Sequence, residues 1–428
     1  MGRPARRVRL EGVTDLTSPD DQTADAPADT PEPRLVSAPA EALRPVVEDE
    51  RRLRELVASV ADGHGPIAID AERASGFRYG QKAYLVQLRR AGAGTWLVDP
   101  VMCPDLSELQ DVVGDVEWVL HAATQDLPCL ADLGLHPTRL FDTELGSRLA
   151  GRPRVGLAAA MEHYLGITLA KEHSAQDWST RPLPEPWLVY AALDVEVLVD
   201  LRDAVDEDLR SQGKSGWAAE EFEALTHFRG PAPKVDPWRK TSGLHKVRTR
   251  RGLAVVRELW ETRDRLAQDR DCSPGRVLGD AAIVELALPS GADGTRRTPR
   301  AVQRNPQVWL AAVDRAMLLP EDELPAYHLP SDGPPPQRAW ADKDPVAAAR
   351  LGAVKELVAG LSASVAVPAE NLLTPDTLRR VVWAPPVDES AQGFREILLD
   401  LGARPWQAGL VSPLLAEAAS DHPYPPRV

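Results

Sequence analysis

Apolar residues form short continuous runs over roughly the first 120 positions of the chain and recur at helical spacing after that. Short runs rich in β-branched and aromatic residues are typical of strands. Four such runs predict strands at 66–70, 83–88, 95–98 and 118–121. Helical spacing predicts helices around 104–113, 124–133, 142–150, 155–165 and 184–208. Strands that come first and then alternate with helices predict an α/β sheet with helices on both faces.

Beyond about residue 245 the pattern is helical alone. It forms two units, separated by a linker with three consecutive prolines at 334–336. Two blocks occur in the same order in both units: Leu253–Leu259 aligns with Leu351–Leu357, and Val277–Ile283 with Leu372–Leu378. Amphipathic helices share Leu and Glu by chance, but the shared order of two blocks favours a true repeat. A count of two excludes a solenoid.

The segment 1–42 is rich in Asp, Pro, Ala and Thr and poor in large apolar residues, so we expect an acidic, disordered tail. The other boundaries follow from the changes of pattern. They are 43–212 for the α/β domain, 213–245 for a linker that is basic at its end, 246–326 for the first helical unit, 327–345 for the Pro-rich linker and 346–420 for the second unit.

The net charge of −14 at first argues against a nucleic-acid partner. The stretch 234–257, however, carries eight Lys and Arg residues against the single acid Asp236, and a binding surface needs only local charge. The alternative interpretation is that this basic stretch is a solvated linker that binds nothing. No apolar run approaches the roughly 18 residues that span a bilayer, so we expect no membrane segment. The spacing of the three cysteines fits neither disulfides nor zinc, which favours reduced thiols in the cytoplasm.

Asp70 and Glu72 end the first predicted strand. They are two residues apart, so on a strand both side chains lie on one face. Two acids at the end of an apolar strand are costly unless a cation such as a divalent metal compensates. Taken alone, most such pairs are simply solvated strand ends.

Three more residues become significant in combination with this pair. Asp126 falls in the first turn of a predicted helix after a strand, where an acid can merely complement the helix dipole. Tyr190 and Asp194 are four residues apart on an apolar helix and share a face. Asp194 therefore needs a partner for its charge.

The strand Asp-x-Glu, the Asp after the second strand and the helical Tyr-x-x-x-Asp are about 55 and then about 65 residues apart. This pattern resembles the DEDD family of 3′–5′ exonucleases, in the subgroup with Tyr four residues before the last Asp. Four further stretches are similar to ribonuclease D: His121-Ala-Ala-Thr-Gln-Asp126, Phe141-Asp142-Thr143, Asp177-Trp178 and Arg181-Pro182-Leu183. The helical units resemble an HRDC domain and a divergent second copy, so the resemblance covers about nine-tenths of the chain.

The resemblance implies an α/β ribonuclease H-like exonuclease domain followed by two small all-α HRDC-type domains. It implies that Asp70, Glu72, Asp126 and Asp194 bind two divalent metal ions, Mg²⁺ or Mn²⁺, and that Tyr190 orients or deprotonates the attacking water. The expected activity is that of a monomeric exoribonuclease that trims the 3′ ends of tRNA precursors and other small structured RNAs and releases nucleoside 5′-monophosphates.

Two other functions stay open. A DNA exonuclease can use the same acids, and no residue reads the 2′-OH unambiguously. A non-catalytic RNA-binding protein could keep the fold, although the presence of all five motif residues argues against it. The segment 74–81 departs from the family by being basic and glycine-containing, and we interpret it as a substrate-contact loop. The candidate nucleic-acid contacts are Arg78, Tyr79, Lys246, Arg248, Arg250 and Arg251.

Overall fold

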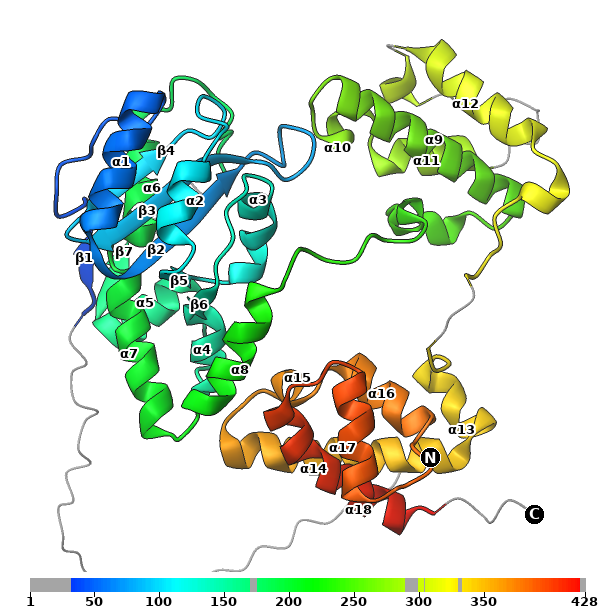
Figure 1. Ribbon diagram of the computed structural model, residues 1–428. Coiled ribbons are helices and arrows are strands. Elements are labelled where there is room, and N and C mark those ends of the chain that lie inside the picture. Colours follow the sequence, from blue (N-terminus) through cyan, green and yellow to red (C-terminus); the bar gives the residue numbers. More distant parts are fainter. Residues whose placement is uncertain (1–31, 170–174, 289–298, 304, 330–332, 424–428) are drawn as a thin grey trace, which may run out of the picture.

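The computed structural model describes residues 32–169, 175–288, 299–303, 305–329 and 333–423 (Figure 1). They form an α/β domain and two helical units. Most of the expected disordered tail, 1–31, lies outside the described residues. Its last part differs from the expectation, because strand β1 (Arg34–Val36) pairs in parallel with β7 (Ile167–Leu169). A three-residue strand is too short to stand out against the composition around it.

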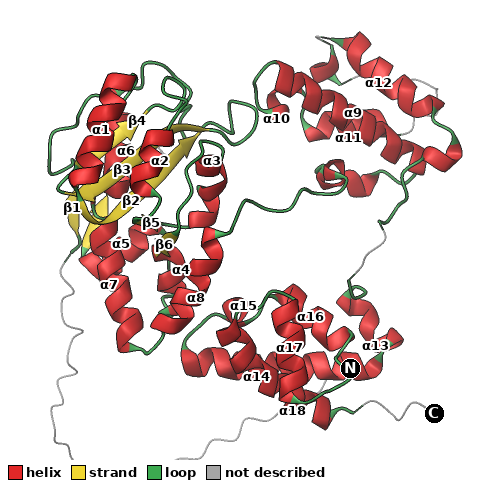
Figure 2. Ribbon diagram, in the orientation of Figure 1, coloured by secondary structure: helices red, strands yellow, loops and turns green. Residues whose placement is uncertain are grey.

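The main sheet has five strands in the order β4-β3-β2-β5-β6 (Figure 2). They are β2 (His64–Arg73), β3 (Ala83–Ala91), β4 (Gly94–Val98), β5 (Glu117–Leu120) and β6 (Arg139–Asp142). The first three are antiparallel, whereas β5 runs parallel to both β2 and β6. All four predicted strands are present. Strand β6 escaped prediction because only Leu140 and Phe141 mark it.

Helices cover both faces of this sheet. They are α1 (Glu50–Asp62), α2 (Ser107–Val113), α3 (Leu127–Ala131), α4 (Thr143–Leu149), α5 (Leu157–Leu165), α6 (Glu185–Glu196), α7 (Leu198–Ser211) and α8 (Ser215–Thr226). Helices α1 and α2 pack together on the side that faces the viewer in Figure 1, while α6 and α7 contact β2 from the other side. The predicted helix at 184–208 is broken at Val197, whose φ of −118° and ψ of 11° interrupt the helical path.

The expected linker at 213–245 begins with a helix. Helix α8 packs on β6, and the rings of Phe222 and Phe141 lie 4.5 Å apart. Its apolar residues Trp217, Ala218 and Phe222 recur at helical spacing among charged ones, so the α/β domain extends to about residue 226. The chain then reaches the turn η2 (Pro237–Lys240), where Trp238 is already buried in the core of the first helical unit.

The two helical units share one stretch of their path. The first contains α9 (Arg250–Asp269), α10 (Pro274–Val277), α11 (Asp280–Ala287) and α12 (Pro306–Leu318). The second contains α13 (Trp340–Lys343), α14 (Pro345–Val365), α15 (Ala369–Leu372), α16 (Pro375–Trp383), α17 (Ala391–Asp400) and α18 (Pro405–Asp421). After the long helix, each has a left-handed residue (Asp271 or Ala366), a one-turn helix and an extended buried leucine (Leu278 or Leu373).

Both units contact the α/β domain. The end of α9 meets the loop after β2, and the second unit packs against α8. There the rings of Trp217 and Trp406 stack 5.0 Å apart. The second unit's apolar residues belong to the same core cluster as those of the α/β domain. Among the described residues, no helix is long and apolar enough to cross a membrane.

Candidate functional site

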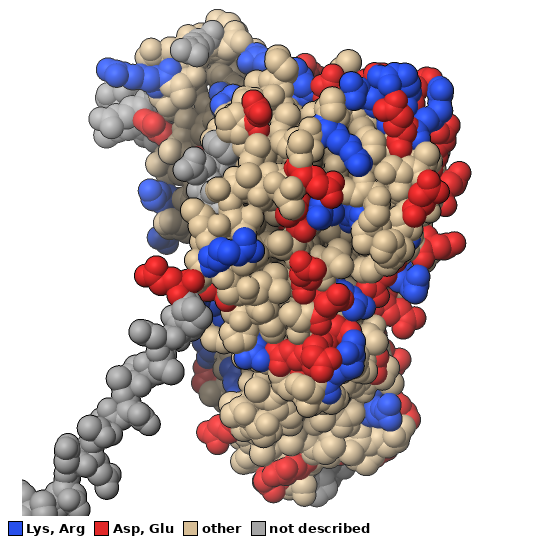
Figure 3. Space-filling view, turned by 90° about the vertical axis from the view of Figure 1, so that its left-hand side faces the viewer, with Lys and Arg blue, Asp and Glu red and all other residues tan. Residues whose placement is uncertain are grey.

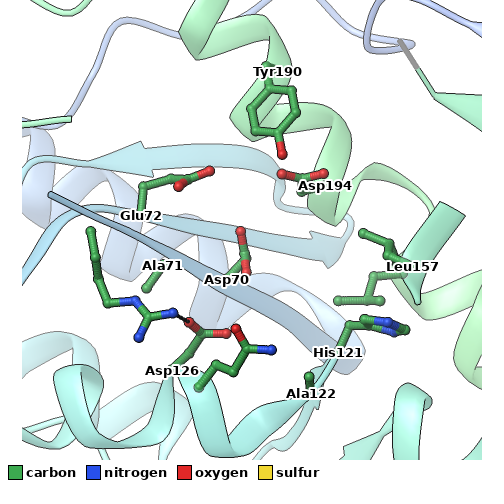
Figure 4. A pocket seen from close by; sticks show the side chains of 12 residues that line it. Asp70, Ala71, Glu72, His121, Ala122, Asp126, Leu157, Tyr190 and Asp194 are labelled. Atoms are coloured by element: carbon green, nitrogen blue, oxygen red, sulfur yellow. Dashed lines mark ion pairs between the residues drawn. The ribbon is translucent and has the colours of Figure 1, made fainter. Parts of the chain in front are cut away.

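Three carboxylates meet between the central strand and helix α6. Asp70 and Glu72 are two residues apart on β2, and α6 lies across β2, β3 and β4. Tyr190 and Asp194 are one turn apart on α6 and both line the pocket that contains the two strand acids (Figure 4). Carboxylate oxygens of Asp70, Glu72 and Asp194 lie within 4.8 Å of one another. The structure thus brings together residues separated by more than a hundred positions.

Asp126 completes the acidic lining from another element. It lies at the start of α3, after the turn η1 (Ala123–Gln125) that follows β5, and its side chain makes no capping hydrogen bond. It is only 5% exposed and lines the same cavity, whose volume is about 210 Å³. All five predicted residues therefore line one pocket, which the sequence order alone could only suggest.

Asp142 holds the turn that presents Asp126, a role that reasoning from the sequence missed. Its carboxylate accepts hydrogen bonds from the backbone N–H groups of Ala122 and Ala123, at 3.0 and 2.8 Å. It also caps α4 through the N–H of Glu144. Ala122 has a left-handed φ of 60°, which these bonds help to maintain. The signal was the Phe141-Asp142-Thr143 stretch, whose acid had no assigned task.

Burial of closely spaced carboxylates dominates the electrostatics of the pocket, and their mutual repulsion comes second. Burial raises the pKa of Asp70 and of Asp126. Burial first, and then repulsion from Asp70 and Asp194, raises the pKa of Glu72 to about 9. Burial, followed by the charges of Asp194 and Glu72, raises the pKa of Tyr190 above its usual range. A cation would relieve this repulsion, and an all-oxygen donor set suits a hard divalent ion.

His121 lines the same pocket but is held as a neutral core histidine. The Thr143 hydroxyl donates to the Leu120 carbonyl at 3.1 Å, so the ring Nδ1 at 2.9 Å donates to Thr143. Burial lowers the pKa of His121 to about 4. This agrees with a packed, hydrogen-bonded histidine rather than a metal ligand. The second histidine near the motifs, His173, lies outside the described residues.

Arg78 and Tyr79, expected to contact substrate, bind the first helical unit. The Tyr79 hydroxyl donates to Asp264 at 3.0 Å, and its backbone N–H reaches Asp271 at 3.3 Å. Arg78 forms an ion pair of 3.3 Å with Asp271 and donates to Ser179 at 2.7 Å. The loop after β2 is thus a contact between domains.

Four of the candidate nucleic-acid contacts are basic residues at 246–251, and two of these four make internal contacts. Arg250 donates to the carbonyl of Leu324 at 2.6 Å, and Arg251 donates to that of Ala316 at 3.1 Å. They hold the segment that follows α12. Lys246 and Arg248 are exposed, and neither side chain has an ion pair within the described part of the chain.

A basic cavity that the sequence did not signal lies at the end of α9. It has a volume of about 480 Å³ and is lined by Arg270, Arg276 and Arg300 and by the buried Trp309, with no acid among its described lining residues. Arg276 lies 4.8 Å over the ring of Phe77, so the cavity adjoins the contact between domains. On the face in Figure 3, by contrast, basic and acidic side chains are interspersed. The three arginines are too far apart in sequence to appear as a charge run.

Family models match three parts of the chain. Residues 45–210 match a 3′–5′ exonuclease, 252–289 an HRDC domain and 333–419 a 3′ to 5′ exonuclease C-terminal domain. Curated relatives agree. Ribonuclease D of Escherichia coli is 31% identical over 270 residues, which are 60% of this chain and 71% of that protein. Ribonuclease D of Gluconacetobacter diazotrophicus is 32% identical over 290 residues, or 64% and 72% of the two chains.

Two solved structures are similar over most of the chain. A protein from Bifidobacterium adolescentis has a TM-score of 0.80 and 37% identity, over 91% of this chain and all of that one. Escherichia coli RNase D, described as an exoribonuclease involved in structured RNA processing, has a TM-score of 0.64 and 25% identity over 90% of this chain and 100% of its own. An exonuclease domain, an HRDC domain and a helical C-terminal region are therefore confirmed. The chain belongs to the ribonuclease D family of 3′–5′ exoribonucleases.

Proposed function

We propose that this exoribonuclease trims the 3′ ends of tRNA precursors and other small structured RNAs and releases nucleoside 5′-monophosphates. The observation that carries the proposal is the convergence of Asp70, Glu72, Asp126, Tyr190 and Asp194 on one pocket from three separate elements. A structured substrate needs contacts beyond that pocket, and the chain offers two helical units docked on its nuclease domain.

Four carboxylates and no sulfur or imidazole ligand fit two divalent ions, Mg²⁺ or Mn²⁺. Asp70, Glu72 and Asp194 would hold one, and Asp126 with Asp70 would support the second. When bound, such ions supply an activated water and stabilise the charge on the leaving 3′ oxygen.

Tyr190 is proposed to position the attacking water rather than to deprotonate it. Its hydroxyl is hydrogen-bonded to Asp194 within the acidic pocket. Burial and the neighbouring negative charges raise the pKa of Tyr190, so the phenol stays protonated at neutral pH. A protonated hydroxyl can orient a water by hydrogen bonding but is a poor base.

We propose that the helical units bind RNA through phosphate contacts, which supply affinity that does not depend on sequence. Exposed Lys246 and Arg248 are the candidates retained from the sequence, and the cavity of Arg270, Arg276 and Arg300 adds a second basic surface. Arg250 and Arg251 would support this surface by fixing the segment after α12.

The second helical unit is proposed to be a divergent HRDC-type domain. Its support is the shared path of the two units, in which Asp271 and Ala366 are left-handed and Leu278 and Leu373 are extended and buried. Because both units dock on the nuclease domain of the same chain, we propose that the protein acts as a monomer. The free cysteines Cys103, Cys129 and Cys272 suit a reducing cytoplasm.

A direct assay tests the proposed substrate. The full chain is incubated with a 3′-extended tRNA and a matched single-stranded DNA, in Mg²⁺, Mn²⁺ or EDTA, with products followed from both ends. We expect stepwise loss of 3′ nucleotides from the RNA as 5′-monophosphates, and none in EDTA. Preferential digestion of DNA would favour the alternative, a DNA exonuclease. RNA binding without any turnover would favour a non-catalytic RNA-binding protein.

A further inference from the structure

A single guanidinium enters the acidic pocket. Arg73 directly follows Glu72 and, among the described lining residues, is the one Arg or Lys. A side-chain nitrogen of Arg73 lies 3.8 Å from a carboxylate oxygen of Asp126, and Figure 4 marks this ion pair with a dashed line. The Asp126 side chain is 8% exposed and that of Arg73 is 26% exposed, so water screens the pair only partly.

The end of β2 explains how Arg73 reaches Asp126. The pairing of β2 with β3 shifts register between Glu72 and Arg73, which marks a bulge or irregularity. A register shift of this kind changes the direction of the side chains that follow it, and β-bulges often occur beside active sites. Asp126 follows β5, which runs parallel to β2, so both residues lie where neighbouring strands end.

The ion pair divides the pocket into two halves. Asp70, Glu72 and Asp194 lie close enough to share one cation, whereas Asp126 is outside this group and faces Arg73. A cation approaching Asp126 therefore meets the Arg73 guanidinium beside a single carboxylate, while one approaching the other group meets three carboxylate side chains that can bind it together. Coulomb repulsion in a partly buried site disfavours the former.

We propose that Arg73 is a substrate-binding residue. Its guanidinium stays paired with Asp126 until RNA binds and then contacts a phosphodiester oxygen of the 3′-terminal nucleotide. In the RNA-free protein it weakens binding of a second cation at Asp126. The planar guanidinium matches the geometry of a phosphate, whose negative charge replaces that of Asp126 as its partner. The proposal rests on the proposed metal-dependent RNA cleavage at this pocket.

Titration of the RNA-free, full-length protein with Mn²⁺ tests the first half, because free Mn²⁺ is followed by its electron paramagnetic resonance signal. We expect the wild-type protein to bind one ion tightly and a second much more weakly. Arg73→Gln should tighten the second ion by at least about tenfold, since it removes the opposing charge. Arg148→Gln, which breaks an ion pair with Glu144 on α4 outside the pocket, should leave both affinities unchanged.

Steady-state kinetics with a short single-stranded RNA test the second half. Arg73→Gln should raise KM by roughly tenfold or more at saturating Mn²⁺, and Arg73→Lys should restore part of the loss because the charge remains. A thermal melt of each variant confirms that it is folded. If the affinity of Arg73→Gln for the second ion and its KM for RNA are both within twofold of the wild-type values, the proposal is overturned. If the wild-type protein binds no Mn²⁺ that Asp70→Asn removes, the proposed metal site itself fails, which is a separate result.

Discussion

The hydroxyl of Tyr79 donates a hydrogen bond of 3.0 Å to Asp264, which joins the loop after β2 to helix α9. The same loop directly follows strand β2, so the position of the HRDC domain depends on the strand that carries Asp70 and Glu72. If the HRDC domain binds RNA as proposed, this contact connects that binding surface to the candidate site.

Tyr79→Phe combined with Asp271→Ala should loosen this contact. One partly exposed hydrogen bond contributes about 1 kcal/mol, so we expect cleavage of a structured RNA to fall several-fold while cleavage of a short single strand is unchanged. The ratio of kcat/KM for the two substrates is the measurement. Tyr327→Phe is the control, since its hydroxyl bonds to the Arg248 carbonyl within one helical unit. Equal losses on both substrates would contradict a role in domain placement.

Asp194→Asn should abolish metal-dependent turnover without unfolding the protein. It removes a negative charge that repels Glu72, so the thermal midpoint of the variant in EDTA should equal or exceed that of wild type. Mn²⁺ at 100 times its Kd should stabilise wild type by about 2.7 kcal/mol and the variant by much less. Asp200→Asn, at an exposed acid on α7, is the matched control. Metal-dependent turnover of Asp194→Asn at a rate close to that of wild type would refute the assignment of Asp194 as a metal ligand.

Tyr190→Phe distinguishes positioning from proton transfer. If the hydroxyl only orients the water, kcat should fall by less than about 10², and the alkaline limb of the pH–rate profile should keep its shape. The raised pKa of Tyr190, caused first by burial, places its own titration above the assay range. A loss of 10²–10⁴, roughly what removal of a general base costs, together with a changed limb would instead identify Tyr190 as the base.

His121 should make the protein less stable in acid. Burial lowers its pKa to about 4, against 6.5 for the unfolded chain, so between these values only the unfolded state takes up the proton. Above pH 6.5 the residue therefore does not affect the free energy of unfolding. As the pH drops toward 4, the free energy of unfolding falls by about 3 kcal/mol in all. Urea unfolding of His121→Gln across this range should show a shallower fall. His245→Gln, at an exposed position, should leave the fall as steep as in wild type.

Arg181 belongs to a stretch shared with ribonuclease D, yet its contacts are structural. It donates to the carboxylate of Asp99 at 2.9 Å, and Asp99 is buried at 1% side-chain exposure. It also donates to the carbonyls of Tyr84 and Trp178. Arg181→Met should cost about 3–5 kcal/mol, because it leaves a buried carboxylate unpaired. Chemical denaturation measures this loss, and kcat at a permissive temperature should change little.

Local patterns were enough to predict the four strands and most of the helices of the α/β domain, but each of the five pocket residues had another explanation when taken alone. Strand and helix periodicity are properties of neighbouring residues, and so is the spacing that places Asp70 with Glu72 and Tyr190 with Asp194 on common faces. The pocket itself was predicted only because the order and spacing of these motifs resembled a known family.

Tertiary structure decided which partner each charged side chain has. Arg78, Tyr79, Arg250 and Arg251 all looked available to RNA, but folding brings acids and carbonyl groups from distant positions to meet them. The ion pair of Arg73 with Asp126, and the three-arginine cavity, likewise join residues that are far apart along the chain. The sequence around a charged residue does not indicate which distant residue it will contact. Only the packing of the elements could therefore assign these contacts.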